Sequence, residues 1–147
     1  MANHIHRQIR EAIASAVTGL ASTGSNVYVN RLYAIPPASL PALRIAIDSE
    51  TVDALSIHQP LMLSRTLQIS IECCAQGGDT LDDTCDQMSK EVETALSAGF
   101  SLGGLTRIPI LTASGYDDDP AGLDTAVKRL EFTLTVETLN TAPDALI

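Results

Sequence analysis

Apolar residues near the start of the chain are spaced as on one face of a helix. They are Ile5, Ile9, Ile13, Val17 and Leu20. The intervals between them are four, four, four and three residues, and the charged residues fall mostly on other faces. This periodicity predicts an amphipathic helix over residues 3–20, with Asn3 placed to cap its first turn.

A second helical stripe begins after the glycine pair at positions 77 and 78. Its apolar members are Leu81, Cys85, Met88, Val92 and Leu96. The pattern predicts a helix over residues 79–98, which Asp79 or Thr80 can cap and in which early aspartates favour the positive end of the helix dipole. Gly99 is suited to the C-terminal cap.

Apolar and polar residues alternate in two segments, one between the helices and one after them. Residues 63–73 place apolar side chains at odd positions, interrupted by Arg65, and residues 127–136 alternate with one slip at Lys128–Arg129. The first pattern predicts a strand with one buried face, and the slip in the second predicts a β-bulge. Three further strands are expected over the ranges 27–34, 42–48 and 105–113. Two segments are expected to lie outside strands: an excursion or long hairpin loop at 49–62, and a loop at 114–124.

The order of helix, strands, helix and strands predicts an α+β fold. We expect a mostly antiparallel sheet with two main helices packed on one face, because the strands alternate rather than running uniformly apolar. A length of 147 residues suits one domain spanning 1–147. Residues 1–2 and 139–147 are expected to be mobile tails.

Composition and charge narrow the classes of function. The net charge is -9, which argues against a surface that grips nucleic acid. No apolar run reaches the length of about 18 residues that a membrane span needs, so no membrane partner is expected. The N-terminus lacks the unbroken apolar core of a signal peptide, which predicts a protein made in the cytoplasm.

The candidate chemical groups have simpler structural interpretations. Cys73 and Cys74 are adjacent and point to opposite faces of a strand, which makes them a poor zinc pair. Cys73 continues the apolar face of its strand and Cys85 lies on the helical stripe, so both are expected to pack in the core, and no disulfide is expected. His4 and His6 lie two apart on the expected helix and should point away from each other, which makes them a poor metal pair and predicts a surface or interface role.

Three consecutive carboxylates, Asp117, Asp118 and Asp119, form the sharpest charge cluster. A divalent cation is one alternative, but the calcium-loop pattern is absent and a solvated acidic loop is the simpler interpretation. No nucleophile, phosphate-loop or metalloprotease motif is present. We therefore predict no catalytic residues, no metal site and no cofactor.

The order of elements and several short phrases resemble a known family. The phrases are "LPALRI" from Leu40, "R-x-L-x-I-x-I" from Arg65 and "V-x-R-L-x-F-T-L-x-V" from Val127. Together with the helix and strand order over residues 3–138, they resemble the tail terminator proteins of long-tailed phages, called minor tail protein U in the lambda-like group.

This resemblance implies a non-enzymatic virion subunit at the head-proximal end of the tail. Such a subunit forms a hexameric ring that caps the tail tube, stops its polymerisation and offers a joining surface to the head. The implied partners are further copies of this chain, the tail tube protein and the head–tail connector protein. DNA would be only transmitted cargo, repelled by an acidic lumen to which the loop at Asp117, Asp118 and Asp119 contributes.

The apolar content of residues 49–62 predicts an interface. The residues expected to take part are Val52, Leu55, Ile57, His58, Leu61 and Met62. We expect them to dock on the tail tube or on an adjacent subunit, so that deleting residues 51–60 would spare the fold but stop assembly. The edge strand expected over 105–113 is a second candidate, because it could extend a neighbour's sheet.

Two alternatives remain at this stage. One is another phage neck, connector or tail completion protein, which would share the fold class and differ in the ring it contacts. The other is a small cytosolic metal-dependent domain that uses the acidic loop, for which stabilisation by a metal, abolished by Asp118→Ala, would be the sign.

Overall fold

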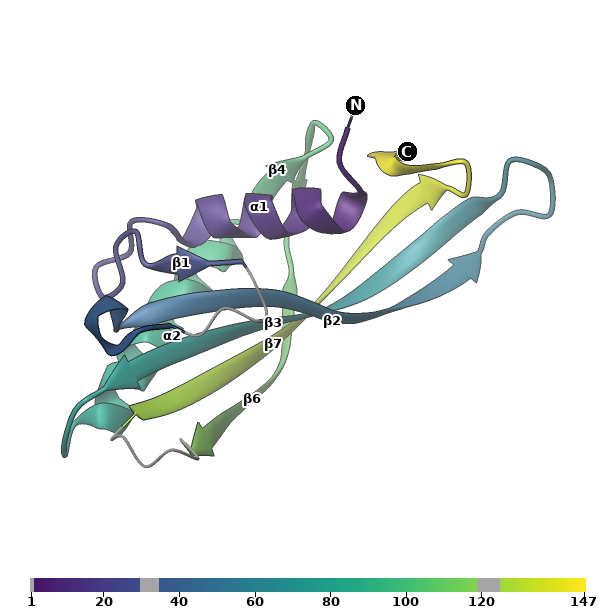
Figure 1. Cartoon of the computed structure of the whole chain (residues 1–147). Coiled ribbons are helices and arrows are strands. Elements are labelled where there is room, and N and C mark those ends of the chain that lie inside the picture. Colours follow the sequence, from purple (N-terminus) through teal and green to yellow (C-terminus); the bar gives the residue numbers. More distant parts are fainter. Residues whose placement is uncertain (1, 30–34, 119–124) are drawn as a thin grey trace.

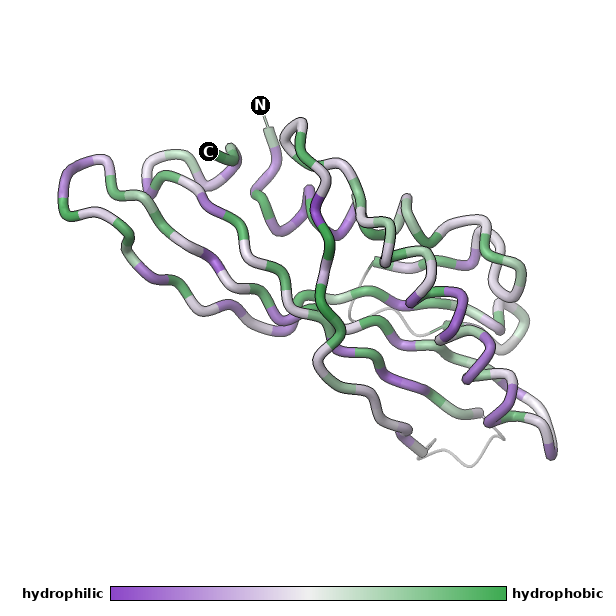
Figure 2. The backbone as a smooth tube through the Cα atoms, turned by 180° about the vertical axis from the view of Figure 1, so that it is seen from behind, coloured by the Kyte–Doolittle hydropathy of each residue, from purple (hydrophilic) through white to green (hydrophobic). Residues whose placement is uncertain are grey.

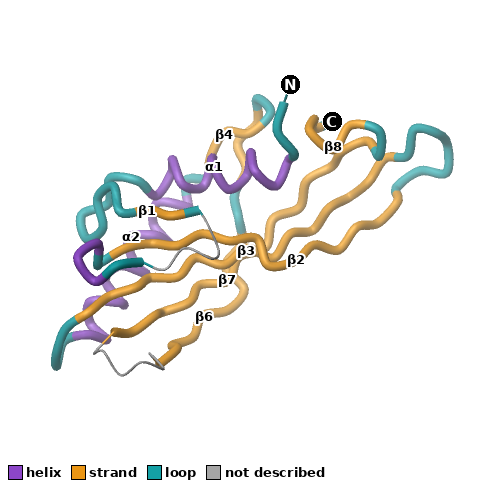
Figure 3. The backbone as a smooth tube through the Cα atoms, viewed as in Figure 1, coloured by secondary structure: helices purple, strands orange, loops and turns teal. Residues whose placement is uncertain are grey.

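A computed structural model describes residues 2–29, 35–118 and 125–147 of the chain. In chain order its elements are α1 (Ile5–Val17), β1 (Val27–Tyr28), the 3-10 turn η1 (Pro37–Ser39), β2 (Ala42–Ala54), β3 (Met62–Gln76), α2 (Leu81–Ser97), β4 (Phe100–Leu102), β5 (Leu105–Arg107), β6 (Ile110–Asp118), β7 (Thr125–Leu139) and β8 (Ala142–Leu146). Figures 1 and 3 show their arrangement.

One curled sheet organises the molecule. Its strand order is β1-β2-β3-β7-β6, with β8 added beside the far end of β7, and every pairing is antiparallel except the short one between β1 and β2. Both helices contribute to the same buried cluster as the inner side chains of β2, β3 and β7. The predicted α+β class, with a mostly antiparallel sheet, is confirmed.

The first helix buries the predicted face, but it begins two residues later and ends three residues earlier than the predicted range 3–20. Ile5, Ile9, Ile13 and Val17 are fully buried against the sheet, whereas Leu20 lies past the helix and is partly buried. The Nδ1 atom of His4 accepts a hydrogen bond from the backbone N–H of His6 at 3.1 Å.

The N-cap is therefore His4, and the assignment of the cap to Asn3 is wrong. The side chain of Asn3 instead faces that of Arg7, one turn into the helix.

The second helix buries the predicted apolar face and ends just before the predicted glycine. Cys85, Met88, Val92 and Leu96 are buried. The chain leaves the helix through Gly99, which has a φ of 76° and donates its N–H to the carbonyl of Leu96. A Cβ atom at this position would lie 2.5 Å from the carbonyl oxygen of Arg107, so glycine is required here both by the left-handed backbone and by close packing.

Strand β2 runs well past the end that the sequence predicts. The pairing register between β2 and β3 shifts between Ile47 and Ser49, which leaves Asp48 as an extra residue. One extra residue exchanges the two faces of a strand, so the inward positions change from odd to even numbers at this point. This change hides the continuation of the strand, and residues 49–54, expected in an excursion, are strand.

Strand β7 pairs with β3 without interruption from Thr125 to Leu139. The bulge expected at Lys128–Arg129 is therefore wrong. Lys128 lies on the helix side of the sheet, where its Nζ atom contacts the Asp86 carboxylate of α2 at 3.1 Å. The apparent slip in the sequence reflects a lysine on the inner face, not an extra residue.

The C-terminal half departs from prediction in two further places. The strand expected over 105–113 is two strands, and β6 continues through residues 114–118, which were expected to be loop. Residues 142–146, expected within a mobile tail, form β8 beside β7. The carbonyl of Asp144 accepts a hydrogen bond from the Nε2 atom of Gln8 at 2.7 Å, which fastens this end of the chain to α1.

Candidate functional site

The most distinctive surface feature is a projecting hairpin, which we call the arm. It comprises residues 49–68, from the bulge in β2 to the matching point in β3, and its connecting loop spans residues 55–61. The arm extends beyond the helices in Figure 1, whereas the part of the sheet before the bulge is covered by them. The bulge therefore marks the boundary between a packed body and an exposed extension.

A polar cluster fixes the base of the arm. The guanidinium of Arg65, 8% exposed as a residue, donates from Nη1 to Glu50 at 2.8 Å and from Nε to the hydroxyl of Thr138 at 2.9 Å. The other Glu50 oxygen lies 2.7 Å from Nε2 of His6 at the start of α1. Four segments thus meet at one carboxylate and one guanidinium, which we call the base cluster (His6, Glu50, Arg65 and Thr138).

The two N-terminal histidines do not point apart as expected. Because His4 lies at the N-cap and outside the helix, its ring packs against the edge of the His6 ring with centroids 4.6 Å apart. Burial, the neighbouring His6 and the cations Arg65 and Arg10 lower the pKa of His4 from 6.5, and Glu50 opposes them.

Most of the residues predicted as an interface are exposed on the arm. Val52, Leu55, Ile57, His58 and Met62 are exposed, and the side chain of Ile57 at the tip is 90% exposed. Leu61 is half-buried, and its N–H and carbonyl both bond to Asn140 in the β7–β8 turn. We refer to Val52, Leu55, Ile57 and Met62 as the tip patch.

A second exposed apolar set lies on the segment that leads from β5 into β6. Its members are Leu105, Ile108, Ile110 and Leu111, of which Leu105 and Ile110 are 60% and 66% exposed. We call this set the edge patch. Figure 2 shows apolar stretches both here and near the end of the arm. The sequence predicted an edge strand in this region, but a run of apolar residues gives no sign that its side chains face solvent.

Two of the three acidic residues predicted at the lumen lie at the end of β6. Asp117 is exposed there, Asp118 is the last residue of the strand, and Asp119 lies outside the described residues. Within the described part of the chain, no group of three or more His, Cys, Asp or Glu side chains gathers as a metal site would require.

The cysteines are buried and unpaired. Cys73 and Cys85 belong to the core cluster, as predicted, and Cys74 is buried on the opposite face of β3 near Ile35 and Leu40. Burial raises the pKa of the Cys73 thiol to about 12 and that of Cys74 to about 11. Thiols with such values stay protonated at neutral pH, so they are poor nucleophiles and poor metal ligands.

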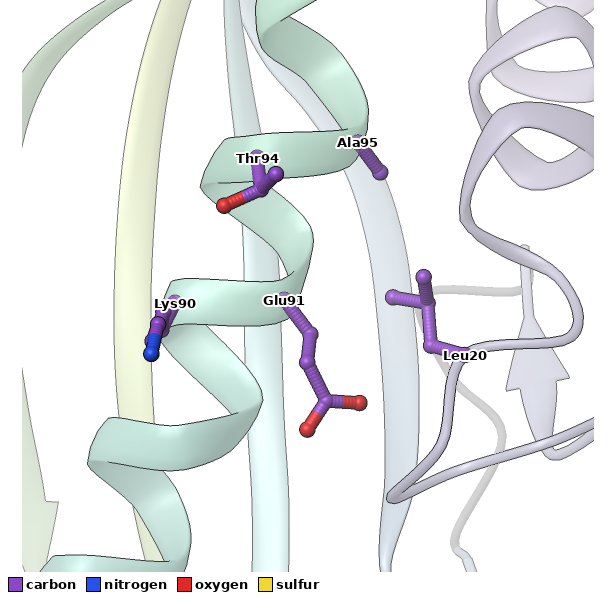
Figure 4. A pocket seen from close by; sticks show the side chains of 5 residues that line it. All are labelled: Leu20, Lys90, Glu91, Thr94 and Ala95. Atoms are coloured by element: carbon purple, nitrogen blue, oxygen red, sulfur yellow. The ribbon is translucent and has the colours of Figure 1, made fainter.

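The apolar groove beside α2 lacks the groups that a catalytic site needs. It has a volume of about 340 Å³ and is lined by Leu20, Lys90, Glu91, Thr94 and Ala95 (Figure 4). Its carboxylate, Glu91, is held by the backbone N–H and hydroxyl of Ser22.

No described helix is long and apolar enough to cross a membrane.

No family model matches the chain, and no curated protein matches it. Among solved structures, it is similar to a chain of the structure titled "Virion of native gene transfer agent (GTA) particle". That alignment has a TM-score of 0.48 and 21% identity, and it covers 92% of both chains.

Proposed function

We propose that the chain is a virion structural subunit of the tail terminator type. In this role, copies of the chain close into a ring at the head-proximal end of a phage tail tube, stop its polymerisation and present a surface to the head connector. The proposal extends the sequence resemblance over residues 3–138, and the arm is the observation that carries it.

The arm fits assembly better than it fits catalysis. An exposed apolar hairpin costs solubility in a monomer and is stabilised when a partner covers it. Its base is held by the part-buried ion pair of Arg65 with Glu50, so the hairpin is presented in a fixed direction. By contrast, no convergent set of reactive side chains accompanies the groove beside α2 in the described residues, which favours a structural role over an enzymatic one.

The charge of the chain fits a conduit for DNA. A ring of subunits that each carry -9 surrounds its lumen with a negative potential, which repels phosphate and lets DNA pass without being held. We place Asp117, Asp118 and Asp119 at the lumen in this arrangement. The tail tube protein and the head connector protein are the expected neighbours of the ring.

The mass of the purified protein in solution tests the proposal. Six copies of the 15.6 kDa chain give about 94 kDa, and light scattering on a sizing column separates this species from a monomer or a dimer. Electron microscopy should then show a ring with a central hole. If only monomers form, tail tubes are added, and a ring bound at one end of each tube is expected. Monomers that ignore the tubes contradict a terminator.

A further inference from the structure

The tip patch and the edge patch lie on different parts of the molecule. Figures 1 and 2 place the end of the arm well away from the segment between β5 and β6. The arm of one chain therefore does not cover its own edge patch, and each patch has room for a partner.

A closed ring needs two such surfaces on every copy. Rotational assembly with more than two members uses heterologous contacts, in which one surface of a copy meets a different surface of the next. The tip patch projects as a hairpin, whereas the edge patch is carried by a segment packed against the body at Gly99. One chain therefore carries two different apolar surfaces, one projecting and one on the body, as a heterologous contact requires.

The charges of the two segments are complementary. Residues 51–62 carry one formal charge, that of Asp53, and residues 105–113 carry one, that of Arg107. Neither side chain has an ion-pair partner among the described residues, Asp53 is exposed and Arg107 is part-exposed. In a chain of net charge -9, an unpaired cation between exposed apolar residues is a suitable receptor for a carboxylate.

We infer that the arm of one copy docks on the β5–β6 segment of the next copy. Leu55 and Ile57 cover Ile108 and Ile110, and the carboxylate of Asp53 pairs with the guanidinium of Arg107. This inference rests on the proposed self-assembly and adds to it which two surfaces meet. The partner is a second copy of this chain, and the tail tube or another protein is the alternative occupant that the test separates.

Cysteine cross-linking between two tagged populations tests the contact directly. One population carries Ile57→Cys and the other Ile108→Cys, and mild oxidation of their mixture should give a dimer that contains both tags. The matched control replaces Ile108→Cys with Thr94→Cys, an exposed position on α2 that the contact does not use. We expect a cross-link yield at least about tenfold above this control. A ratio of ten corresponds to about 1.4 kcal/mol of binding free energy.

A charge exchange gives the second readout. Asp53→Arg or Arg107→Glu alone should lower the cross-link yield severalfold, and combining them in the mixed populations should restore it. A yield equal to the Thr94→Cys control overturns the inference. If sizing still shows a closed ring in that case, the terminator proposal stands and its contacts lie elsewhere. Cross-linking to a tail tube protein instead of a second copy also overturns the inference.

Discussion

At the scale of single residues, Arg65 decides how the arm is held. Arg65 is buried as a residue, and its guanidinium contacts the Glu50 carboxylate at 2.8 Å and the Thr138 hydroxyl at 2.9 Å. A buried ion pair adds little net stability, but removing one partner leaves a charge that neither water nor protein compensates. The base cluster is therefore sensitive to the loss of either member.

We predict that Glu50→Ala lowers the free energy of unfolding by about 1–3 kcal/mol, because the Arg65 guanidinium loses its carboxylate acceptor while water can reach part of the vacated space. Glu11→Ala is the matched control, because Glu11 forms an exposed pair with Arg7 at 2.8 Å and its loss should cost less than about 1 kcal/mol. Urea denaturation followed by circular dichroism measures both. Equal costs for the two variants would show that Arg65 finds another partner or reaches water.

His4 makes the stability of α1 dependent on pH. The folded state lowers the pKa of His4 below 6.5, so its contribution is fully present above about that pH and is lost as the pH falls through the folded pKa. Protonation also removes the Nδ1 acceptor that caps α1. His4→Asn keeps a capping acceptor that does not titrate.

We therefore expect the unfolding temperature to fall less in His4→Asn than in the native chain between about pH 7.5 and about pH 5.5. The difference should correspond to at most about 1 kcal/mol, the typical contribution of an N-cap. Parallel pH profiles for the two proteins would mean that the cap survives protonation.

At the scale of elements, the sequence predicts the helices and strands whose buried residues recur at a regular spacing. Both helical stripes and the odd-numbered inner face of β3 are found as predicted, because burial of one face imposes a fixed spacing. The excursion at 49–62 was predicted, but its strand character was not, because the bulge at Asp48 exchanges the faces of β2 midway. The base cluster was missed because Arg65 and Glu50 come from separate segments, although an arginine within an apolar face was a sign that an acidic partner is required.

Two glycines between α2 and β5 offer a matched pair of substitutions. Gly99 and Gly104 have nearly equal φ values of 76° and 77°, but only Gly99 is closely packed. We predict that Gly104→Ala costs about 1–2 kcal/mol for its left-handed backbone, and that Gly99→Ala costs about 1–3 kcal/mol more for overpacking against β5. Thermal unfolding measures both, and equal costs would show that the β4–β5 hairpin moves aside freely.

A shortened arm separates assembly from folding better than deletion of residues 51–60, which would move Arg65 into the new turn. Asp53 and Ser64 are directly opposed in the β2–β3 ladder, so Asn-Gly can replace residues 54–63 as a two-residue hairpin turn. We expect a native circular dichroism spectrum and loss of the assembled species on a sizing column. His58→Ser, which keeps the full arm, should still assemble. A shortened chain that forms rings normally would exclude the arm from assembly.

At the scale of the whole molecule, net charge opposes the closure that the two patches favour. Copies that each carry -9 repel one another over distances set by the ionic strength, whereas apolar contact acts only at the interface. The negative charge that keeps DNA phosphates from binding in the lumen therefore also opposes the assembly of the subunits into a ring.

Salt should consequently promote assembly. The Debye length falls from about 30 Å at about 0.01 M ionic strength to about 8 Å at about 0.15 M, which removes most of the repulsion between neighbouring copies. The same rise in ionic strength weakens the attraction within a single ion pair such as Asp53 with Arg107. That attraction is smaller than the repulsion summed over the whole charge of each chain. We expect light scattering to show an assembled fraction that rises over this range. An assembled fraction that falls instead would mean that attraction between charges, rather than apolar contact, holds the copies together.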